Sequence, residues 1–125
     1  MSDIKIGIKG EEFIQTDESV SASKVGSGLL NVFATPSMVA LMEKTAHNSL
    51  SAFLEEGYTT VGTILEVKHK KPTSIGQKVT CKSELIKVDG NKLLFEITAW
   101  DEQGEIGYCK HGRAIVNVEK FLEML

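Results

Sequence analysis

Hydrophobic residues recur at the spacing of an amphipathic helix over residues 35–54, the clearest pattern in the chain. Pro36 suits the first helical position, because proline has no N–H to lose there, and Thr35 before it is a favoured N-cap residue. Gly57 is expected to end the last turn. We therefore expect one helix with a broad apolar arc, formed by Met38, Val39, Leu41, Met42, Ala46, Leu50, Ala52 and Phe53.

Beyond this helix the hydrophobic period changes to two, which is typical of strands. In the first of them, alternation places Val61, Thr63 and His69 on the same face. The dipeptide Asp89-Gly90 predicts a tight hairpin turn. Four strands are expected, over residues 59–69, 77–88, 91–100 and 105–118, with a final helical turn after them.

The N-terminal part carries weaker patterns. Isoleucines alternate over residues 4–8 as in a short strand, and residues 11–20 alternate weakly, as a second candidate strand. Residues 21–31 are rich in serine and glycine, which favours a loop. The order of weak strand, long helix and long antiparallel strands predicts an α+β fold. In it, one curved sheet wraps a long central helix, as a single domain over residues 1–125.

Composition narrows the classes of protein. Of the 125 residues, 42% are hydrophobic and 25% are charged, which is ordinary for a globular domain. The net charge of −3 argues against a nucleic-acid partner. No apolar run approaches the ~20 residues that span a bilayer, and the N-terminus lacks a secretory pattern, so no membrane partner is expected. Cys81 and Cys109 form no paired motif. This favours a cytoplasmic protein with reduced thiols over one with a disulfide.

Glu43 lies at one edge of the apolar arc, with His47 one turn further on. The simpler interpretation is a solvated glutamate that pairs with His47. The alternative is a carboxylate at the rim of the buried face that points into a cleft, where it would serve as a general base. The helix alone leaves both open.

Thr35 and His69 are two further candidates. The Thr35 hydroxyl would cap the helix, and it would also lie where backbone N–H groups favour negative charge. His69 ends a strand and is either structural or a proton-transfer group. The surrounding KHKK cluster is either a solvated edge or a phosphate-binding lip.

The last strand carries Cys109, His111 and Arg113 on one face. Cys109, His111 and His69 would supply three metal ligands, but three without a fourth are weak support for a metal site, and none is expected. The sequence contains neither a glycine-rich phosphate loop nor a serine nucleophile elbow.

Three stretches together resemble the fluoroacetyl-CoA thioesterase-like family of hotdog-fold acyl-CoA thioesterases. The shared features are ATP before the helix, ALME in its first turns, TVGT and KH on the next strand, and GxxxHxRA on the last. The resemblance covers residues 32–121 and implies the hotdog fold. The stretches are VFATPSMVALMEKTA, TVGTILEVKHKKPTSIGQKV and DGNKLLFEITAWDEQGEIGYCKHGRAIV.

The resemblance also implies a homodimer with active sites at the subunit interface, and a tetramer is the other assembly considered. The family's catalytic threonine, glutamate and histidine correspond to Thr35, Glu43 and His69. Gly62 matches a glycine that lines the acyl pocket. Arg113 matches an arginine of the last strand, which is expected to contact substrate in a role left open.

Two departures from the family pattern matter. The fluoroacetate-specific member has an aromatic lid before its corresponding segment, whereas residues 24–31 here read KVGSGLLN without an aromatic residue. Selectivity for fluoroacetyl therefore does not carry over. In addition, Gly112 stands between His111 and Arg113, where an acidic residue is common.

We therefore predict an acyl-CoA thioesterase that releases a free acid and coenzyme A. Leu29, Leu30 and Phe33 would line a pocket for a small or short-chain acyl group. Glu43 would be the base or the nucleophile. No metal or bound cofactor is expected, because the thioester is already activated. The alternatives are a non-catalytic module that binds acyl-CoA or a small acid, and a hydratase acting on enoyl-CoA.

Overall fold

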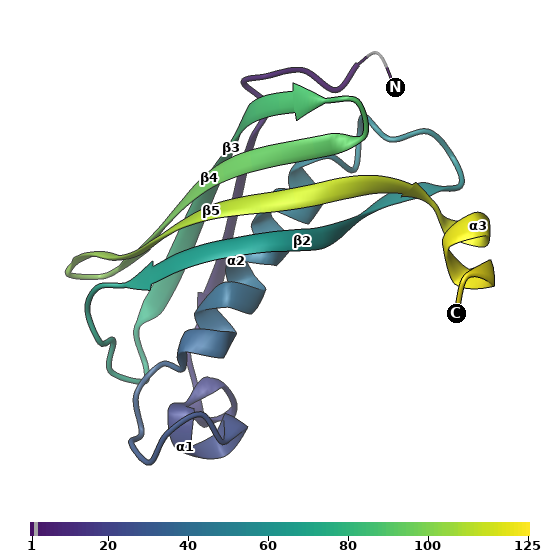
Figure 1. Cartoon of the computed structure of the whole chain (residues 1–125). Coiled ribbons are helices and arrows are strands. Elements are labelled where there is room, and N and C mark those ends of the chain that lie inside the picture. Colours follow the sequence, from purple (N-terminus) through teal and green to yellow (C-terminus); the bar gives the residue numbers. More distant parts are fainter. Residues whose placement is uncertain (2) are drawn as a thin grey trace.

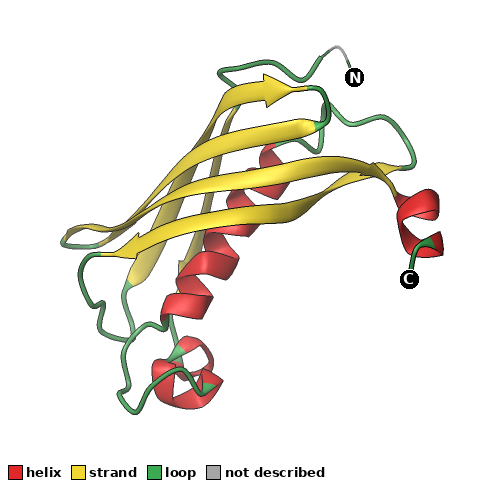
Figure 2. Ribbon diagram, viewed as in Figure 1, coloured by secondary structure: helices red, strands yellow, loops and turns green. Residues whose placement is uncertain are grey.

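One helix lies against one curved antiparallel sheet in the computed structural model, which describes residues 1 and 3–125 (Figure 1, Figure 2). The helix, α2, spans Thr35–Ser49. This arrangement confirms the predicted α+β class. The sheet has the order β1-β3-β4-β5-β2 and is formed by β1 (Lys9–Gln15), β2 (Tyr58–His69), β3 (Lys78–Asp89), β4 (Lys92–Asp101) and β5 (Gly104–Asn117).

α2 is shorter than predicted at its C-terminal end. It ends at Ser49, with Leu50 as C-cap, because the next hydrogen bonds span three residues instead of four. Leu50 is fully buried, but Phe53 turns outward and is 37% exposed. The predicted apolar arc is therefore confirmed as far as Leu50, except that Val39 is only half-buried and lies outside the core, and it is wrong beyond Leu50.

The core lies between α2 and the concave face of the sheet. Burial of each large apolar side chain stabilises the fold by about 1.5–3 kcal/mol, and the alternation along β3 and β4 directs every second side chain inward, most of them apolar. The helix contributes Met38, Leu41, Met42, Ala46 and Leu50, and the sheet contributes Val79, Cys81, Leu85, Leu93, Phe95, Ile97, Ala99, Ile106 and Cys109.

The bounds of the four long strands are confirmed to within one or two residues. The turn between β3 and β4 lies one residue later than predicted. Asp89 pairs with Lys92, so the two turn residues are Gly90 and Asn91 instead of Asp89 and Gly90. Gly90 has a φ of 61°, a conformation that glycine adopts readily. β2 pairs only with β5 and forms one edge of the sheet.

A β-bulge between Gly62 and Ile64 changes which side chains of β2 face the helix. Thr60 and Gly62 face it before the bulge, whereas His69, opposite Gly107, faces it after the bulge. Because side chains alternate strictly along a regular strand, one extra residue reverses the pattern. The prediction that Val61 and Thr63 share a face with His69 is therefore wrong.

The N-terminal segment departs most from prediction. Residues 4–8 form no strand, because the chain turns at Gly7, where φ is 101° and the N–H donates to Leu85 O at 2.8 Å. The weak alternation over residues 11–20 corresponds to β1 and then to the short helix η1 (Glu18–Val20). Residues 21–31 are not all loop.

That segment contains the one-turn helix α1 (Ala22–Val25), which begins after Ser21 and stops at Gly26. At the other end of the chain, the predicted final helical turn is confirmed as α3 (Val118–Glu123). No helix among residues 1 and 3–125 is both long and apolar enough to cross a membrane.

Both cysteines are buried free thiols in the sheet. Burial raises the pKa of Cys81 to about 12 and that of Cys109 to about 11. Because the thiolate is the reactive form, both thiols are expected to be inert near neutral pH.

Candidate active site

Thr35 and His69 meet at the N-terminal end of α2. The helix begins at Thr35, but its N-cap is Ala34, which has an extended conformation. The prediction that Thr35 caps the helix is therefore wrong. Its hydroxyl instead lies 2.7 Å from Nδ1 of His69, at the end of β2. The first helical N–H groups have no side-chain cap, so they are available to an anion.

His69 is half-buried. Burial lowers the pKa of His69 below its usual range, and an interaction with the Lys71 backbone opposes this only in part. Its Nε2 atom is buried without a hydrogen-bond partner among the described residues. A neutral imidazole with one unused nitrogen is suited to accept or donate a proton near neutral pH.

A hollow of about 300 Å³ opens beside this pair. Phe33 lines it, as predicted, but Leu29 and Leu30 do not and are 95% and 68% exposed. Lys70 pairs with Glu105, so one lysine of the KHKK cluster has a local structural role. The lining residues are Ala22, Ser27, Val32, Phe33, Thr35, His69, Lys70, Lys71 and Pro72.

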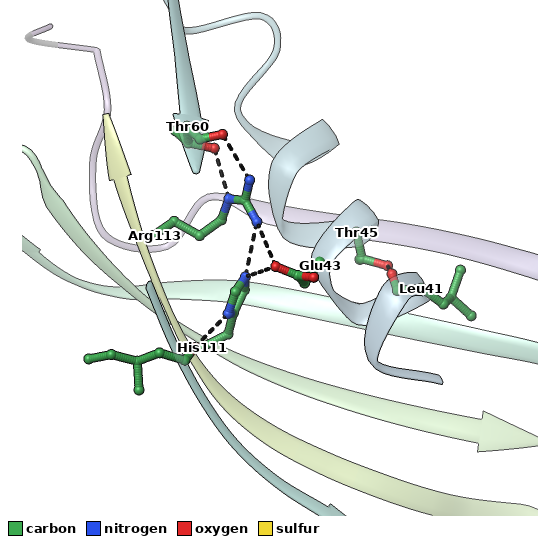
Figure 3. A network of polar contacts seen from close by, with 7 residues as sticks. Leu41, Glu43, Thr45, Thr60, His111 and Arg113 are labelled. Carbon is green, nitrogen blue, oxygen red and sulfur yellow. Dashed lines mark hydrogen bonds and ion pairs between the residues drawn. The ribbon is translucent and has the colours of Figure 1, made fainter. Parts of the chain in front are cut away.

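Glu43 forms a second group, two turns further along the same helix (Figure 3). Its Oε2 lies 3.6 Å from Nη1 of Arg113 and 3.9 Å from Nε2 of His111, both on β5. The Arg113 and His111 side chains are buried, whereas that of Glu43 is 38% exposed. Glu43 is thus directed toward a buried cation and pairs with Arg113 instead of His47.

Gly62 leaves the space that this carboxylate occupies. A Cβ atom at Gly62 would lie 2.4 Å from Oε2 of Glu43 and 3.3 Å from Cε1 of His111. Such a separation is far below van der Waals contact, so an alanine here would displace the carboxylate. Gly62 therefore shapes the surroundings of Glu43, a role that the sequence did not indicate.

A single chain does not bring Thr35, Glu43 and His69 together. Thr35 and Glu43 are eight positions apart on one helix, which corresponds to about 12 Å along its axis. Among the described residues, Glu43 makes no hydrogen bond or ion pair with Thr35 or His69. The chain thus presents two separate groups.

Thr60 was missed by sequence reasoning. It accepts a hydrogen bond from Nε of Arg113 at its hydroxyl, at 2.8 Å, and a second from Nη2 at its carbonyl, at 2.9 Å. The bulge on β2 hides this role, because regular alternation counted back from His69 places Thr60 on the opposite face. His69, Cys109 and His111 form no metal site: no group of three ligand side chains is suitably placed within the described part of the chain.

The amino-acid sequence of the chain is similar to those of known thioesterases. The family model described as fluoroacetyl-CoA-specific thioesterase matches residues 15–119. A fluoroacetyl-CoA thioesterase from Streptantibioticus cattleyicolor is 40% identical over 90 residues, which are 72% of this chain. The match spans only 65% of that relative's length.

Two solved structures share the fold. A variant of the fluoroacetyl-CoA-specific thioesterase, in complex with fluoroacetate and CoA, has a TM-score of 0.89 and 30% identity. The alignment covers 94% of this chain and 99% of that one. A hot-dog-like protein from Thermanaerovibrio acidaminovorans has a TM-score of 0.86 at 22% identity, over 95% of this chain and 88% of the other. The hotdog fold predicted from the sequence is confirmed.

Proposed function

Because the chain belongs to the fluoroacetyl-CoA-specific thioesterase family, we propose that it is an acyl-CoA thioesterase acting on a small or short-chain acyl group. The products are the free acid and coenzyme A, which takes part only as a portion of the substrate. One observation supports the proposal most directly. Thr35 and His69 form one group and Glu43 belongs to another, and the edge strand β2 runs past both groups.

The active form is a homodimer that pairs through the outer edge of β2. An open edge strand is a template for another strand, and here it exposes Ile64 and Leu65 by 53% and 44%. A two-fold axis through Glu66 would pair two copies of β2 in antiparallel register, with Leu65 opposite Val67 of the partner subunit and with Gly62 and Thr63 at the bulge opposite one residue. His69 would then lie opposite Gly62 of the partner subunit.

This register completes the site. Opposite residues of an antiparallel pair have Cα atoms about 5 Å apart, and the Glu43 carboxylate lies over Gly62. The partner subunit's Glu43 would therefore join Thr35 and His69. The dimer would contain two equivalent sites, each with residues from both chains.

Hydrolysis then uses the groups of both subunits. In the general-base route, Glu43 takes a proton from a water molecule, whose oxygen forms the new bond to the thioester carbonyl carbon. The C–S bond breaks when the tetrahedral intermediate collapses. In the nucleophilic route, the Glu43 carboxylate itself forms that bond, the C–S bond breaks as the thiolate leaves, and water then cleaves the resulting anhydride. Glu43 must therefore contact the attacking water in the first route and the carbonyl carbon in the second.

The other group supports the developing charges. The uncapped N–H groups at the start of α2 stabilise the oxyanion. His69 supplies the proton for the leaving thiolate or helps to activate the water, and its hydrogen bond to Thr35 fixes the ring. The reduced thiols and the coenzyme A substrate support a cytoplasmic location.

The test is thiol release from a panel of acyl-CoA substrates, from acetyl-CoA to palmitoyl-CoA, together with sedimentation of the protein. We expect hydrolysis of the short thioesters by a species of at least twice the 13.7 kDa chain mass. Binding of acyl-CoA without turnover would favour a binding module, and addition of water to crotonyl-CoA would favour a hydratase.

A further inference from the structure

Three contacts hold the guanidinium of Arg113, which also faces Glu43 (Figure 3). Its Nε and Nη2 donate to the hydroxyl and carbonyl of Thr60, and its Nη1 lies 3.1 Å from Nε2 of His111. A guanidinium is planar, so these contacts together determine the direction of its remaining N–H groups. Nη1 is thereby directed at Oε2 of Glu43.

The contacts of His111 require one tautomer. Its Nδ1 lies 2.8 Å from the Ile64 carbonyl, which can only accept, so Nδ1 carries a hydrogen. Its Nε2 lies beside Nη1 of Arg113, which can only donate, so Nε2 is a bare acceptor. His111 is therefore neutral, and its 3.9 Å approach to Glu43 is not a salt bridge.

The surroundings of His111 agree with this assignment. The ring is fully buried. Burial lowers the pKa of His111, and the Arg113 cation lowers it further, against the opposing effects of the Ile64 carbonyl and Glu43. Protonation would also place two hydrogen-bond donors face to face at Nε2.

The 3.6 Å separation between Glu43 and Arg113 is too long for a good hydrogen bond. The carboxylate is attracted by the cation without being capped by it, and its oxygens stay available to a water molecule or a thioester carbon. A small rotation of the Arg113 guanidinium would change where the Glu43 carboxylate lies. The residues that fix the direction of the guanidinium therefore also fix the position of that carboxylate.

We propose that His111 and Thr60 are positioning residues that aim Arg113 at Glu43, with neutral His111 acting as a hydrogen-bond acceptor. The proposal rests on the proposed thioesterase function for its effect on rate. It assigns no contact with substrate to either residue. The β2 bulge is part of the arrangement, because Thr60 and the Ile64 carbonyl lie on either side of it.

Conservative pairs of variants test this on the full-length chain. His111→Leu removes the acceptor, whereas His111→Gln offers an amide oxygen near the position of Nε2. Thr60→Val removes the hydroxyl with little change of shape, whereas Thr60→Ser retains it. Thr98→Val is the matched control, since Thr98 is a strand threonine outside this network.

We expect His111→Leu and Thr60→Val to lower kcat by about 10-fold or more through misplacement of Glu43, with little change in KM. His111→Gln and Thr60→Ser should recover most of the rate, and in the Glu43→Gln background neither loss should recur. Wild-type kcat in both apolar variants would overturn the proposal, as would equal losses in the Leu and Gln variants. If His111→Leu does not fold, the comparison of kcat between Thr60→Val and Thr60→Ser tests the proposal instead.

Nitrogen-15 NMR of the histidine rings supplies a readout that does not need turnover. A neutral His111 with a protonated Nδ1 at pH 7 supports the proposal, and a charged or Nε2-protonated ring overturns it. If the wild type hydrolyses no acyl-CoA, the proposed function has failed, and the ring state then decides on the positioning network alone.

Discussion

The Thr35 hydroxyl lies 2.7 Å from Nδ1 of His69, which joins the start of α2 to the end of the edge strand β2. Glu43, on the same helix, instead faces Arg113 on β5, beside Gly62 of β2. In the proposed dimer, pairing of two copies of β2 would bring His69 of one subunit close to the Glu43 carboxylate of the other.

Glu43→Gln tests the carboxylate. The amide keeps the shape but removes the charge, so kcat/KM on the best substrate should fall by about 10²- to 10⁴-fold. Arg113 would lose a partly exposed partner, and the free energy of unfolding should fall by only about 1 kcal/mol or less. A thermal melt checks the fold, and Glu84→Gln on β3 is the control for an exposed glutamate. Activity within about threefold of wild type would rule out Glu43 as base or nucleophile.

Gly62→Ala tests the space beside that carboxylate. The new Cβ would lie 2.4 Å from Oε2, so the flexible end of Glu43 must move. Because an ångström of misplacement costs about 10²-fold in rate, kcat should fall by that order while the melting temperature changes little. The same substitution in the Glu43→Gln background should cause no further loss. A Gly62→Ala variant with wild-type kcat would mean that Glu43 need not occupy this position.

The acyl preference follows from the size of the hollow beside Thr35. At about 300 Å³ it lies at the small end of ligand pockets, and Phe33 closes part of its wall. We expect kcat/KM to fall from short acyl-CoA substrates toward palmitoyl-CoA. A steady rise along that series would contradict the small-substrate assignment.

Stability should depend on pH through half-buried His69 and buried His111. The folded-state pKa of His69 and that of His111 are lowered, so the unfolded chain binds more protons as the pH falls below about 6.5. The free energy of unfolding should therefore decrease from pH 7 toward pH 5, by at most about 1.4 kcal/mol per pH unit for each histidine. Urea titrations should show a shallower decrease in His111→Gln. An unchanged slope would indicate that His111 titrates normally.

The sequence identifies the long helix and strands because their apolar residues keep one period over many positions. It misplaces the helix N-cap, since Pro36 is acceptable at either of the first two helical positions and Ala34 supplies the extended conformation. The isoleucines of residues 4–8 alternate without pairing as a strand. Gly7 is a local signal of that turn, but the alternation of the isoleucines around it outweighed the signal.

The candidate site is only half readable from sequence. The edge of the helix, its start and a strand end made Glu43, Thr35 and His69 candidates, and the family resemblance then assigned them together as the catalytic set. The contacts of Arg113 with Thr60 and His111 were missed, because they depend on the bulge after Gly62 and on segments that are far apart in the sequence. The alternation rule fails at the bulge, so Val61 and Thr63 were predicted on the face of His69, where Thr60 and Gly62 lie instead.

Complementation between two inactive chains tests the shared site most directly. Thr35→Ala and Glu43→Gln chains, carrying different tags, are co-expressed, and the mixed dimer is compared with each parent. If each site draws Thr35 and Glu43 from different subunits, one site of every mixed dimer is intact, so a random mixture recovers about a quarter of wild-type activity. If both residues act within one chain, every site is damaged, and the mixture stays as inactive as its parents.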